Sequence, residues 1–373
     1  MITSRQKCKE LDGTLVVAAE RRRGRGAAGN PAARFEREVR INADDGWESA
    51  AELPPFRTQV TVERPRSIIS RNTSPDLGFD RSVNPYRGCE HGCVYCFARP
   101  THAYLGLSPG LDFETRLFAK PDAAALLARE LGAAGYECRT MALGTNTDPY
   151  QPIERDHRIT RSILEVLEQH DHPVGIVTKS DLVVRDRDIL ARMAAKELAK
   201  VAISVTTLDR DLARKMEPRA PTPAKRLDAI RGLSEAGVPV TLLAAPIIPA
   251  INDHEIERIV DAAAAAGARH AGYVLLRLPL EISDIFQDWL CRVAPDRAGR
   301  VMSLMRGARG GKDYQSAWGL RMRGDGPYAW TIARRFQLAA RRAGLDHDRI
   351  ALRTDLFRPP RPAGRQLDLF DGR

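Results

Sequence analysis

The stretch VPVTLLAAPII, residues 238–248, is an unbroken apolar run with several β-branched residues. A strand that faces water on one side alternates apolar and polar residues, whereas this run is apolar on both sides. It therefore predicts a strand of a parallel sheet that is covered on both faces by helices. Similar runs occur at residues 140–145, 173–179, 200–207 and 270–279.

Segments with helical periodicity separate these runs, at residues 121–131, 159–170, 187–199, 223–236 and 253–266. Gly237 and Gly267 follow the last two segments, as expected at the carboxyl end of a helix. Strands that alternate with helices of this length indicate βαβ units. With one more strand near residues 79–86 the prediction is six parallel strands, in an open doubly wound sheet or a barrel.

Polar side chains gather at the carboxyl ends of the predicted strands. GTNTDPYQP (residues 144–152) follows the second strand, Lys179 the third, and IPAIND (residues 248–253) the fifth, while Ser204 lies late in the fourth. Both fold types bind their ligands at this edge of the sheet. We therefore expect the functional site at this edge.

The stretch GCEHGCVYCFARP, residues 88–100, places Cys89, Cys93 and Cys96 close together after the first predicted strand. Thiolates suit zinc, copper(I) or iron–sulfur clusters. A structural zinc site normally has four ligands arranged in two pairs, and this stretch lacks a second cysteine pair. Three cysteines on one loop can instead ligate three irons of a 4Fe–4S cluster and leave the fourth iron open. Zinc stays the alternative metal.

The spacing Cys-x3-Cys-x2-Cys, with Tyr95 before the last cysteine and a βα repeat after it, resembles the radical SAM superfamily. The resemblance covers roughly residues 67–290. It implies an α/β fold, a partial (βα)6 TIM-like barrel, in which Cys89, Cys93 and Cys96 hold a 4Fe–4S cluster and S-adenosylmethionine (SAM) chelates the open iron. It also implies reductive cleavage of SAM to a 5′-deoxyadenosyl radical, with an electron donor such as flavodoxin or ferredoxin.

Within this superfamily the chain resembles the group around spore photoproduct lyase. The likeness lies in NPYRGCEHGCVYCFAR (residues 84–99), GTNTDPYQPIE (144–154), TKSDLVVRD (178–186), EPRAPTPAKRL (217–227) and APIIPAIND (245–253). It implies that Tyr95 packs beside the adenine of SAM and that Lys179 and Ser204 hold its carboxylate or ribose. Thr147 and Asp148 would then meet the SAM amino group. We expect Arg219 to pair with Glu217 or another acid.

One position departs from that group. Photoproduct lyases use a cysteine near the end of the second strand to return a hydrogen atom, and Thr145 stands there in this chain. A hydroxyl cannot serve as that donor, because its O–H bond is much stronger than a thiol S–H bond. Cys138 precedes the strand and is expected at the opposite rim, and Cys291 follows the sixth helical segment. The thymine-dimer reaction is therefore doubtful, although nucleic acid as a substrate class is not.

The chain carries a net charge of +10, and its excess of Lys and Arg lies in the flanking residues 1–40 and 297–373. Basic flanks beside a more acidic body suit a polyanionic partner such as nucleic acid. An Arg-rich composition that merely gives a solvated surface is an alternative of equal weight. We divide the chain into a disordered basic region 1–53, a radical SAM core 54–290, a helical basic extension 291–357 and a flexible tail 358–373.

The helical extension is expected to pack on the barrel through Trp330, Ile332, Phe336 and Leu338, which recur at helical spacing. Four arginines should then face solvent on the other side: Arg334, Arg335, Arg341 and Arg342. Such a region could close the open side of the partial barrel and carry an anionic substrate.

The tail ends in RQLDLFDGR, after a stretch rich in Pro and Arg that should be extended. Five of its residues resemble the peptide with which bacterial replication and repair proteins dock into the DNA sliding clamp: Gln366, Leu367, Asp368, Leu369 and Phe370. A free apolar segment suits capture by a groove on a partner. Folding of Leu369 and Phe370 back onto the barrel is the alternative.

Three functions follow from these observations. The first is a radical SAM enzyme that acts on nucleic acid, as in DNA repair. The second is a radical SAM enzyme with a peptide or small metabolite as substrate, and the third is a zinc module that recruits DNA-associated partners. The sequence has no apolar run long enough for a membrane span and no secretory signal at its start, so we expect a soluble cytoplasmic protein.

Overall fold

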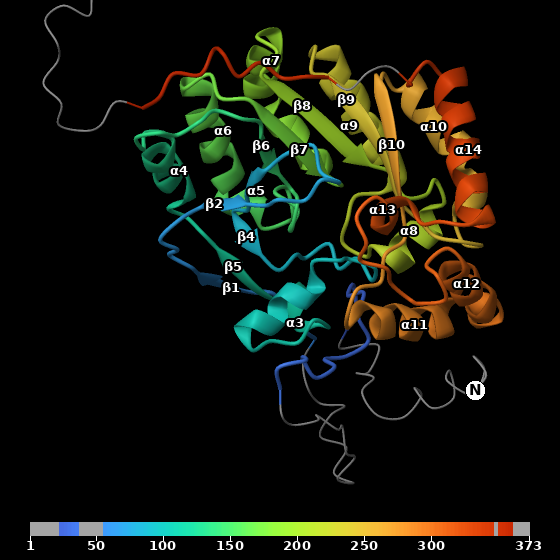
Figure 1. Cartoon of the computed structure of the whole chain (residues 1–373). Coiled ribbons are helices and arrows are strands. Elements are labelled where there is room, and N and C mark those ends of the chain that lie inside the picture. The colour runs from blue at the N-terminus through green and yellow to red at the C-terminus, as the bar shows by residue number, and fades with distance from the viewer. Residues whose placement is uncertain (1–21, 37–54, 347–349, 361–373) are drawn as a thin grey trace, which may run out of the picture.

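The computed structural model describes residues 22–36, 55–346 and 350–360. Its centre is a seven-stranded sheet in the order β10-β9-β8-β7-β6-β3-β2 (Figure 1). The strands are β2 (Ile69–Arg71), β3 (Arg81–Val83), β6 (Met141–Leu143), β7 (Val174–Thr178), β8 (Ala199–Ser204), β9 (Val240–Ile247) and β10 (His270–Leu275). Within this sheet β3, β6, β7, β8, β9 and β10 are parallel and follow one another in chain order, whereas β2 pairs antiparallel with β3. The six predicted parallel strands and the partial (βα)6 barrel are confirmed.

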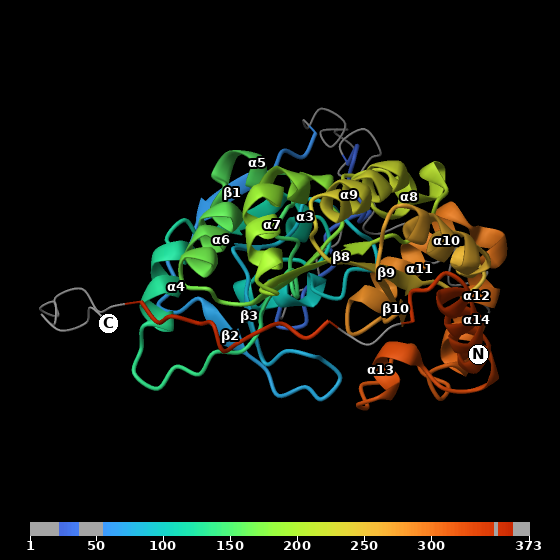
Figure 2. The same cartoon turned by 90° about the horizontal axis from the view of Figure 1, so that it is seen from above.

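Helices cover the outer face of this sheet and connect successive strands (Figure 2). They are α4 (Ala123–Leu131), α6 (Ile159–Gln169), α7 (Arg187–Ala195), α9 (Pro223–Glu235) and α10 (Ile256–Ala265). Their apolar faces bury residues such as Leu127, Ile163 and Leu190 against the strands. This is the amphipathic pattern from which the helices were predicted.

Short elements fill the connections between the strands and the long helices. A second sheet joins β1 (Gln59–Val62), β5 (Arg116–Ala119) and β4 (Tyr86–Arg87) in the order β1-β5-β4. The remaining short helices are η1 (Arg99–Leu105), α3 (Asp112–Thr115), α5 (Glu154–His157), η2 (Asp181–Asp186), α8 (Arg210–Met216) and η3 (Asp253–Glu255). The second sheet did not follow from the sequence, because its strands are too short to show a period.

Residues 22–36 correct the expectation of disorder through residue 53. The backbone N–H groups of Gly26 and Ala27 donate to the buried carboxylate of Glu114 at 2.8 and 2.9 Å, and Arg25 donates to the Glu114 carbonyl. A Cβ on Gly26 would lie 1.9 Å from the carbonyl oxygen of Gly92. The segment is therefore bound by hydrogen bonds and close backbone contact, neither of which gives a sequence period.

The C-terminal part begins as predicted, with α11 (Ile282–Val293), α12 (Pro295–Gly307), α13 (Leu320–Arg323) and α14 (Pro327–Arg342). Residues 350–360 are not helical, contrary to the expected extension through 357, and they cross the amino ends of the strands. There the N–H of Arg353 donates to Glu197 and the N–H of Arg358 to His170. Phe357 packs against Tyr136. No helix of the described residues is long and apolar enough to cross a membrane.

Helix α14 presents a different face from the one expected. Ile332 and Phe336 are buried, and the Phe336 ring lies 4.8 Å from that of Tyr273 in β10. Trp330 and Leu338 are 62% and 49% exposed, so their predicted packing is wrong. Trp330 and Leu338 are each two or six residues away from Ile332 and Phe336. These spacings place them on another face of the helix than the buried residues.

The expected solvent face of this helix is also partly occupied. Arg335 forms an ion pair with Glu257 of α10 at 2.7 Å, and Arg342 pairs with Asp261 at 2.9 Å. Two of the four arginines thus hold α14 against α10.

We predict that Phe336→Ala lowers the free energy of unfolding by about 3–5 kcal/mol, because it leaves a cavity against Tyr273. Trp330→Ala is the control, since this exposed side chain should contribute less than about 1 kcal/mol. Denaturant unfolding of both variants measures the difference. Equal losses would show that the buried face of α14 is assigned wrongly.

Candidate active site

The cysteine loop lies between β4 and η1, at the carboxyl end of the first barrel strand β3. Gly88 and Gly92 have φ angles of +73° and +68°, a region that favours glycine. A Cβ on Gly88 would also lie 2.6 Å from the Leu117 side chain. The two glycines therefore allow a tight loop that carries Cys89, Cys93 and Cys96.

Arg99 holds this loop in shape from inside the protein. Its fully buried guanidinium donates to the carbonyls of Cys93 and Gly92 at 2.8 and 3.1 Å and forms an ion pair with Glu114 at 2.5 Å. A buried charge is tolerated only when it is paired and its donors are satisfied, and both conditions hold here. This role was not predicted, because the local sequence FARP does not show which groups the guanidinium contacts.

A cavity of about 190 Å³ opens beside the loop, at the carboxyl ends of the barrel strands. The side chains singled out in the sequence all line it: Cys89, Cys93, Cys96, Tyr95, Thr147, Asp148, Lys179 and Ser204. These residues come from the cysteine loop and from the ends of β6, β7 and β8. The predicted edge of the sheet is therefore where the chain brings them together.

The three cysteines of the loop all line this cavity. Burial raises the pKa of Cys89, Cys93 and Cys96, and nearby carboxylates add to the effect for the first two. Among the described residues, no three His, Cys, Asp or Glu side chains converge on one metal-ion position. Three cysteines on one loop that line the same cavity fit a cluster that has a metal at each corner, and binding to iron deprotonates a thiol despite its burial.

Lys179 projects from the end of β7 into the same cavity. Its Nζ lies 3.4 Å from Oε1 of Glu217 and 5.6 Å from the centre of the Tyr95 ring. Burial lowers the pKa of this ammonium group, and the charges of Cys93 and Asp148 oppose the shift. The buried Glu217 also pairs with Arg226 and accepts a hydrogen bond from Thr206 at 2.8 Å. The lysine therefore lies in a fixed position beside the thiols.

Asp148 organises the loop after β6. Its carboxylate accepts hydrogen bonds from the hydroxyl of Thr178 at 2.6 Å, the N–H of Lys179 at 2.8 Å and the N–H of Tyr150 at 2.9 Å. Burial acts to raise its pKa, but the charge and hydrogen bond of His91 and the bond from Thr178 outweigh this, so the pKa of Asp148 is lowered. The carboxylate is thus ionised and binds β6 to β7.

The other predicted polar residues are placed as follows. Thr147 is buried and its hydroxyl donates to the carbonyl of Tyr86 at 2.9 Å. Ser204 is buried at the end of β8. Arg219 lies 3.3 Å from Glu90, so it pairs with another acid than Glu217.

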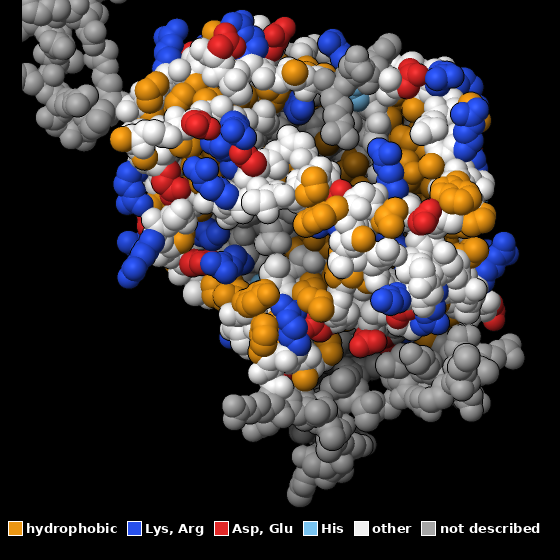
Figure 3. Space-filling view, viewed as in Figure 1, with side chains coloured by type: hydrophobic (Ala, Val, Ile, Leu, Met, Phe, Trp, Pro, Cys, Tyr) orange, Lys and Arg blue, Asp and Glu red, His pale blue; other side chains and the backbone are white. Residues whose placement is uncertain are grey.

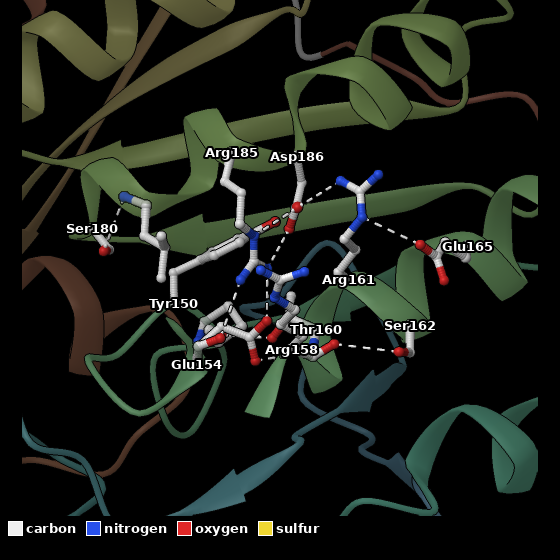
Figure 4. A network of polar contacts seen from close by, with 12 residues as sticks. Tyr150, Glu154, Arg158, Thr160, Arg161, Ser162, Glu165, Ser180, Arg185 and Asp186 are labelled. Carbon is white, nitrogen blue, oxygen red and sulfur yellow. Dashed lines mark hydrogen bonds and ion pairs between the residues drawn. The ribbon is translucent and has the colours of Figure 1, made fainter. Parts of the chain in front are cut away.

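A network of ion pairs joins the segments that follow β6 and β7 (Figure 4). Arg185 pairs with Glu154 and with Asp186, at 2.7 Å in both cases, and Arg161 contacts Asp186 at 2.9 Å. Glu154 also accepts a hydrogen bond from Tyr86, which precedes the cysteine loop. The network therefore fixes the loops that follow β4, β6 and β7 relative to one another.

Thr145 does not line the cavity, although Gly144, Asn146 and Thr147 on either side do. Gly144 has a φ of +83°, and a Cβ there would lie 1.9 Å from the carbonyl oxygen of Val177. Cys138, which lies before β6, is likewise absent from the cavity lining. Within the described residues, the cysteines that line the cavity are those of the loop.

Phe97 and Arg277 also line the cavity, and neither was anticipated. Arg277 follows β10 in the run LLRLP, so it obeys the rule that polar residues after a strand face the site. The rule therefore holds for the sixth predicted strand as well as for the second to fifth. Phe97 gave no signal, because an apolar residue beside a cysteine is equally suited to a core.

The family model for the radical SAM superfamily matches residues 83–263. An uncharacterised protein of Mycobacterium tuberculosis is 38% identical over 232 residues, which cover 62% of this chain and 68% of that protein. The chain belongs to the radical SAM superfamily. An uncharacterised protein of Methanocaldococcus jannaschii is 30% identical over 173 residues, or 46% of this chain and 62% of that protein.

Solved structures of spore photoproduct lyase share the radical SAM fold of this chain. A tyrosine-to-phenylalanine mutant of the lyase superposes with a TM-score of 0.55 at 17% identity, over 76% of this chain and 80% of that one. A second mutant, with bound AdoMet and dinucleoside spore photoproduct, gives a TM-score of 0.52 at 18% identity, over 76% and 77%. The likeness at this identity is one of fold.

The cofactors of this superfamily are a 4Fe–4S cluster and SAM. When bound, they supply reductive cleavage of SAM to a 5′-deoxyadenosyl radical. The residues present fit them, because three cysteines on one loop and the buried Lys179 line the same cavity. The chain itself holds the three thiols in a fixed loop. It also places the cavity at the carboxyl ends of the barrel strands.

We predict that Glu217→Gln lowers the free energy of unfolding by about 3–5 kcal/mol, since it leaves Arg226 buried without a carboxylate. Denaturant unfolding provides the measurement. Glu257→Gln is the control, because its pair with Arg335 is about one third exposed and should contribute less than about 1 kcal/mol. Similar effects of the two changes would contradict the ion-pair role given to Glu217.

Proposed function

We propose that this protein is a radical SAM enzyme that acts on nucleic acid. The observation that carries the enzyme assignment is the single cavity lined by the three cysteines together with Tyr95, Lys179 and Ser204. The basic flanks of a chain with net charge +10 support a polyanionic substrate. Reduction of the cluster would come from an electron donor such as flavodoxin or ferredoxin.

In this proposal each predicted residue has a role. Cys89, Cys93 and Cys96 ligate the cluster, and Tyr95 packs beside the adenine of SAM. Lys179 is an ammonium group suited to the SAM carboxylate, and Ser204 offers a hydroxyl to the ribose.

Thr147 and Asp148 are proposed to meet the SAM amino group. Asp148 is suited to this, because its carboxylate stays ionised beside the cavity. Thr147 has a hydroxyl that already donates to Tyr86, so it would act as an acceptor.

The reaction differs from that of spore photoproduct lyase. The lyase returns a hydrogen atom from a cysteine near the end of the second strand, whereas this chain has Thr145 at the corresponding position. Cys138 does not line the cavity. We therefore propose a hydrogen-abstracting reaction on a nucleic acid that does not use this protein thiol.

We predict that anaerobic reconstitution gives a cluster with a broad absorption band at about 400 nm, and that dithionite with SAM then releases 5′-deoxyadenosine. Cys93→Ala should abolish cluster assembly, because it removes one of three ligands. Cys138→Ala, outside the cavity, is the matched control and should assemble the cluster as the wild type does. Tight zinc binding without iron uptake would refute the assignment as a radical SAM enzyme.

A comparison of substrates tests the second half of the proposal. DNA and RNA should increase the release of 5′-deoxyadenosine, and peptide or metabolite pools should not. Stimulation by peptide or metabolite pools alone would refute nucleic acid as substrate and leave the radical SAM assignment intact.

We also propose that the tail recruits the enzyme to a DNA sliding clamp. Gln366, Leu367, Asp368, Leu369 and Phe370 lie outside the described residues. The proposal is supported by their sequence, in which three apolar side chains follow a Pro- and Arg-rich stretch.

We predict that deletion of residues 366–370 removes binding to a purified bacterial sliding clamp, as measured by surface plasmon resonance. Arg365→Ala, just before the motif, is the control and should bind as the wild type does. Unaltered binding after the deletion would refute the clamp proposal without bearing on the cluster.

A further inference from the structure

The mouth of the cavity carries a side-chain pair that the SAM and cluster roles do not use. Phe97 and Arg277 both line the cavity, and the guanidinium of Arg277 lies 4.7 Å from the centre of the Phe97 ring. The phenyl ring is 46% exposed. One face of the ring is therefore covered by the guanidinium, and part of its surface stays open to solvent.

A second pair of an arginine and an aromatic ring is formed by Trp318, just before α13, and Arg321 within it. The guanidinium of Arg321 lies 4.2 Å from the Trp318 ring, which is 56% exposed. Arg321 is held by an ion pair with Asp76 at 2.6 Å, and the N–H of Gly319 donates to the same carboxylate at 2.7 Å. The indole is thus presented by a segment fixed to the loop between β2 and β3.

Arg309 shows that the two pairs lie at the same rim. Its buried guanidinium donates to the carbonyls of Leu275 and Leu276, which line the cavity, and to those of Leu320 and Arg321 in α13. Figure 2 places α13 on the side of the sheet opposite the outer helices. In Figure 3, hydrophobic and basic side chains lie next to one another in the middle of the face that carries α13.

The rim also carries positive charge without a matching carboxylate. In the described part of the chain, neither Arg277 nor Arg309 has an Asp or Glu at ion-pair distance, whereas Arg321 pairs with Asp76. Burial lowers the pKa of both groups, and the charge of Arg277 contributes to lowering the pKa of Arg309 to about 10. Two neighbouring guanidinium groups of this kind attract an anion, and Arg277 reaches the cavity.

We propose that Phe97, Arg277 and Trp318, the rim platform, hold one unstacked nucleotide of a single-stranded nucleic acid at the cavity mouth. A base stacks on an open aromatic face, and Arg277 binds the adjoining phosphate. This inference rests on the proposed function. It adds which residues of the protein contact the nucleic acid and that the nucleic acid is single-stranded. It requires a base outside a duplex, because the faces of a paired base are covered by its neighbours in the stack and cannot contact an aromatic ring.

Nucleic acid fits this surface better than a peptide does. Stacking on aromatic rings beside basic groups is how proteins bind single strands without reading their sequence. An acidic peptide would satisfy Arg277, but it offers no flat partner to two exposed rings that are each covered by a guanidinium on one side.

The test uses the full-length, reconstituted protein and a fluorescein-labelled single-stranded DNA 12-mer, with binding followed by anisotropy at several salt concentrations. Trp318→Ala should weaken binding roughly tenfold at every salt concentration, because a stacking contact is lost. Arg277→Gln should weaken binding and also make the slope of log affinity against log salt shallower by about 0.7, the value for one phosphate contact on a single strand. The iron content of each variant shows that it has folded.

Matched controls exist on α14. Trp330→Ala removes an equally exposed tryptophan, and Arg341→Gln removes an exposed arginine, so both should bind the oligonucleotide as the wild type does. Wild-type protein that binds no nucleic acid would overturn the proposed function together with this inference. Salt-dependent binding that Trp318→Ala and Arg277→Gln leave unchanged would overturn the inference alone. Loss of binding to an acidic peptide in these variants, without oligonucleotide binding, would assign the rim to a peptide and also overturn it.

Discussion

The ion pair between Arg99 and Glu114 is the interaction on which the cysteine loop depends. Both side chains are fully buried, and burial of two charges is costly unless their hydrogen-bonding groups are satisfied. Arg99 meets this condition with the carbonyls of the loop, and Glu114 meets it with the N–H groups of Gly26 and Ala27. The loop and the amino-terminal segment are therefore bound to one buried pair, so that neither can shift without leaving a charge unpaired.

Two further carboxylates organise the strand ends around the cavity in the same way. Glu217 lies between Arg226 and Lys179, and Asp148 accepts hydrogen bonds from residues at the end of β7. Each carboxylate joins two elements of the barrel, because parallel strands end at the same edge of the sheet. Lys179 and Asp148, which line the cavity, thus have positions that are set by their partners. Preorganised charges of this kind bind a charged cofactor without a cost of rearrangement.

The open side of the barrel is completed by residues of the C-terminal part. Arg309 donates to carbonyls at the end of β10, where an edge strand has unpaired backbone groups. The same side chain holds α13 at the cavity mouth. The segment that contacts this sheet edge therefore also carries Trp318, which links the stability of the barrel to the proposed recognition of substrate.

The sequence alone determined the six parallel strands, the helices between them and the set of residues at the strand ends. It could do so because apolar runs, helical periods and cysteine spacing are local properties of the chain. Tertiary structure alone decided that residues 22–36 pack under the cysteine loop, that Trp330 faces away from the barrel, and that Arg277 and Trp318 share one rim. These features depend on buried polar partners and on contacts between segments far apart in the chain, and no local pattern of residues encodes which donor meets which acceptor.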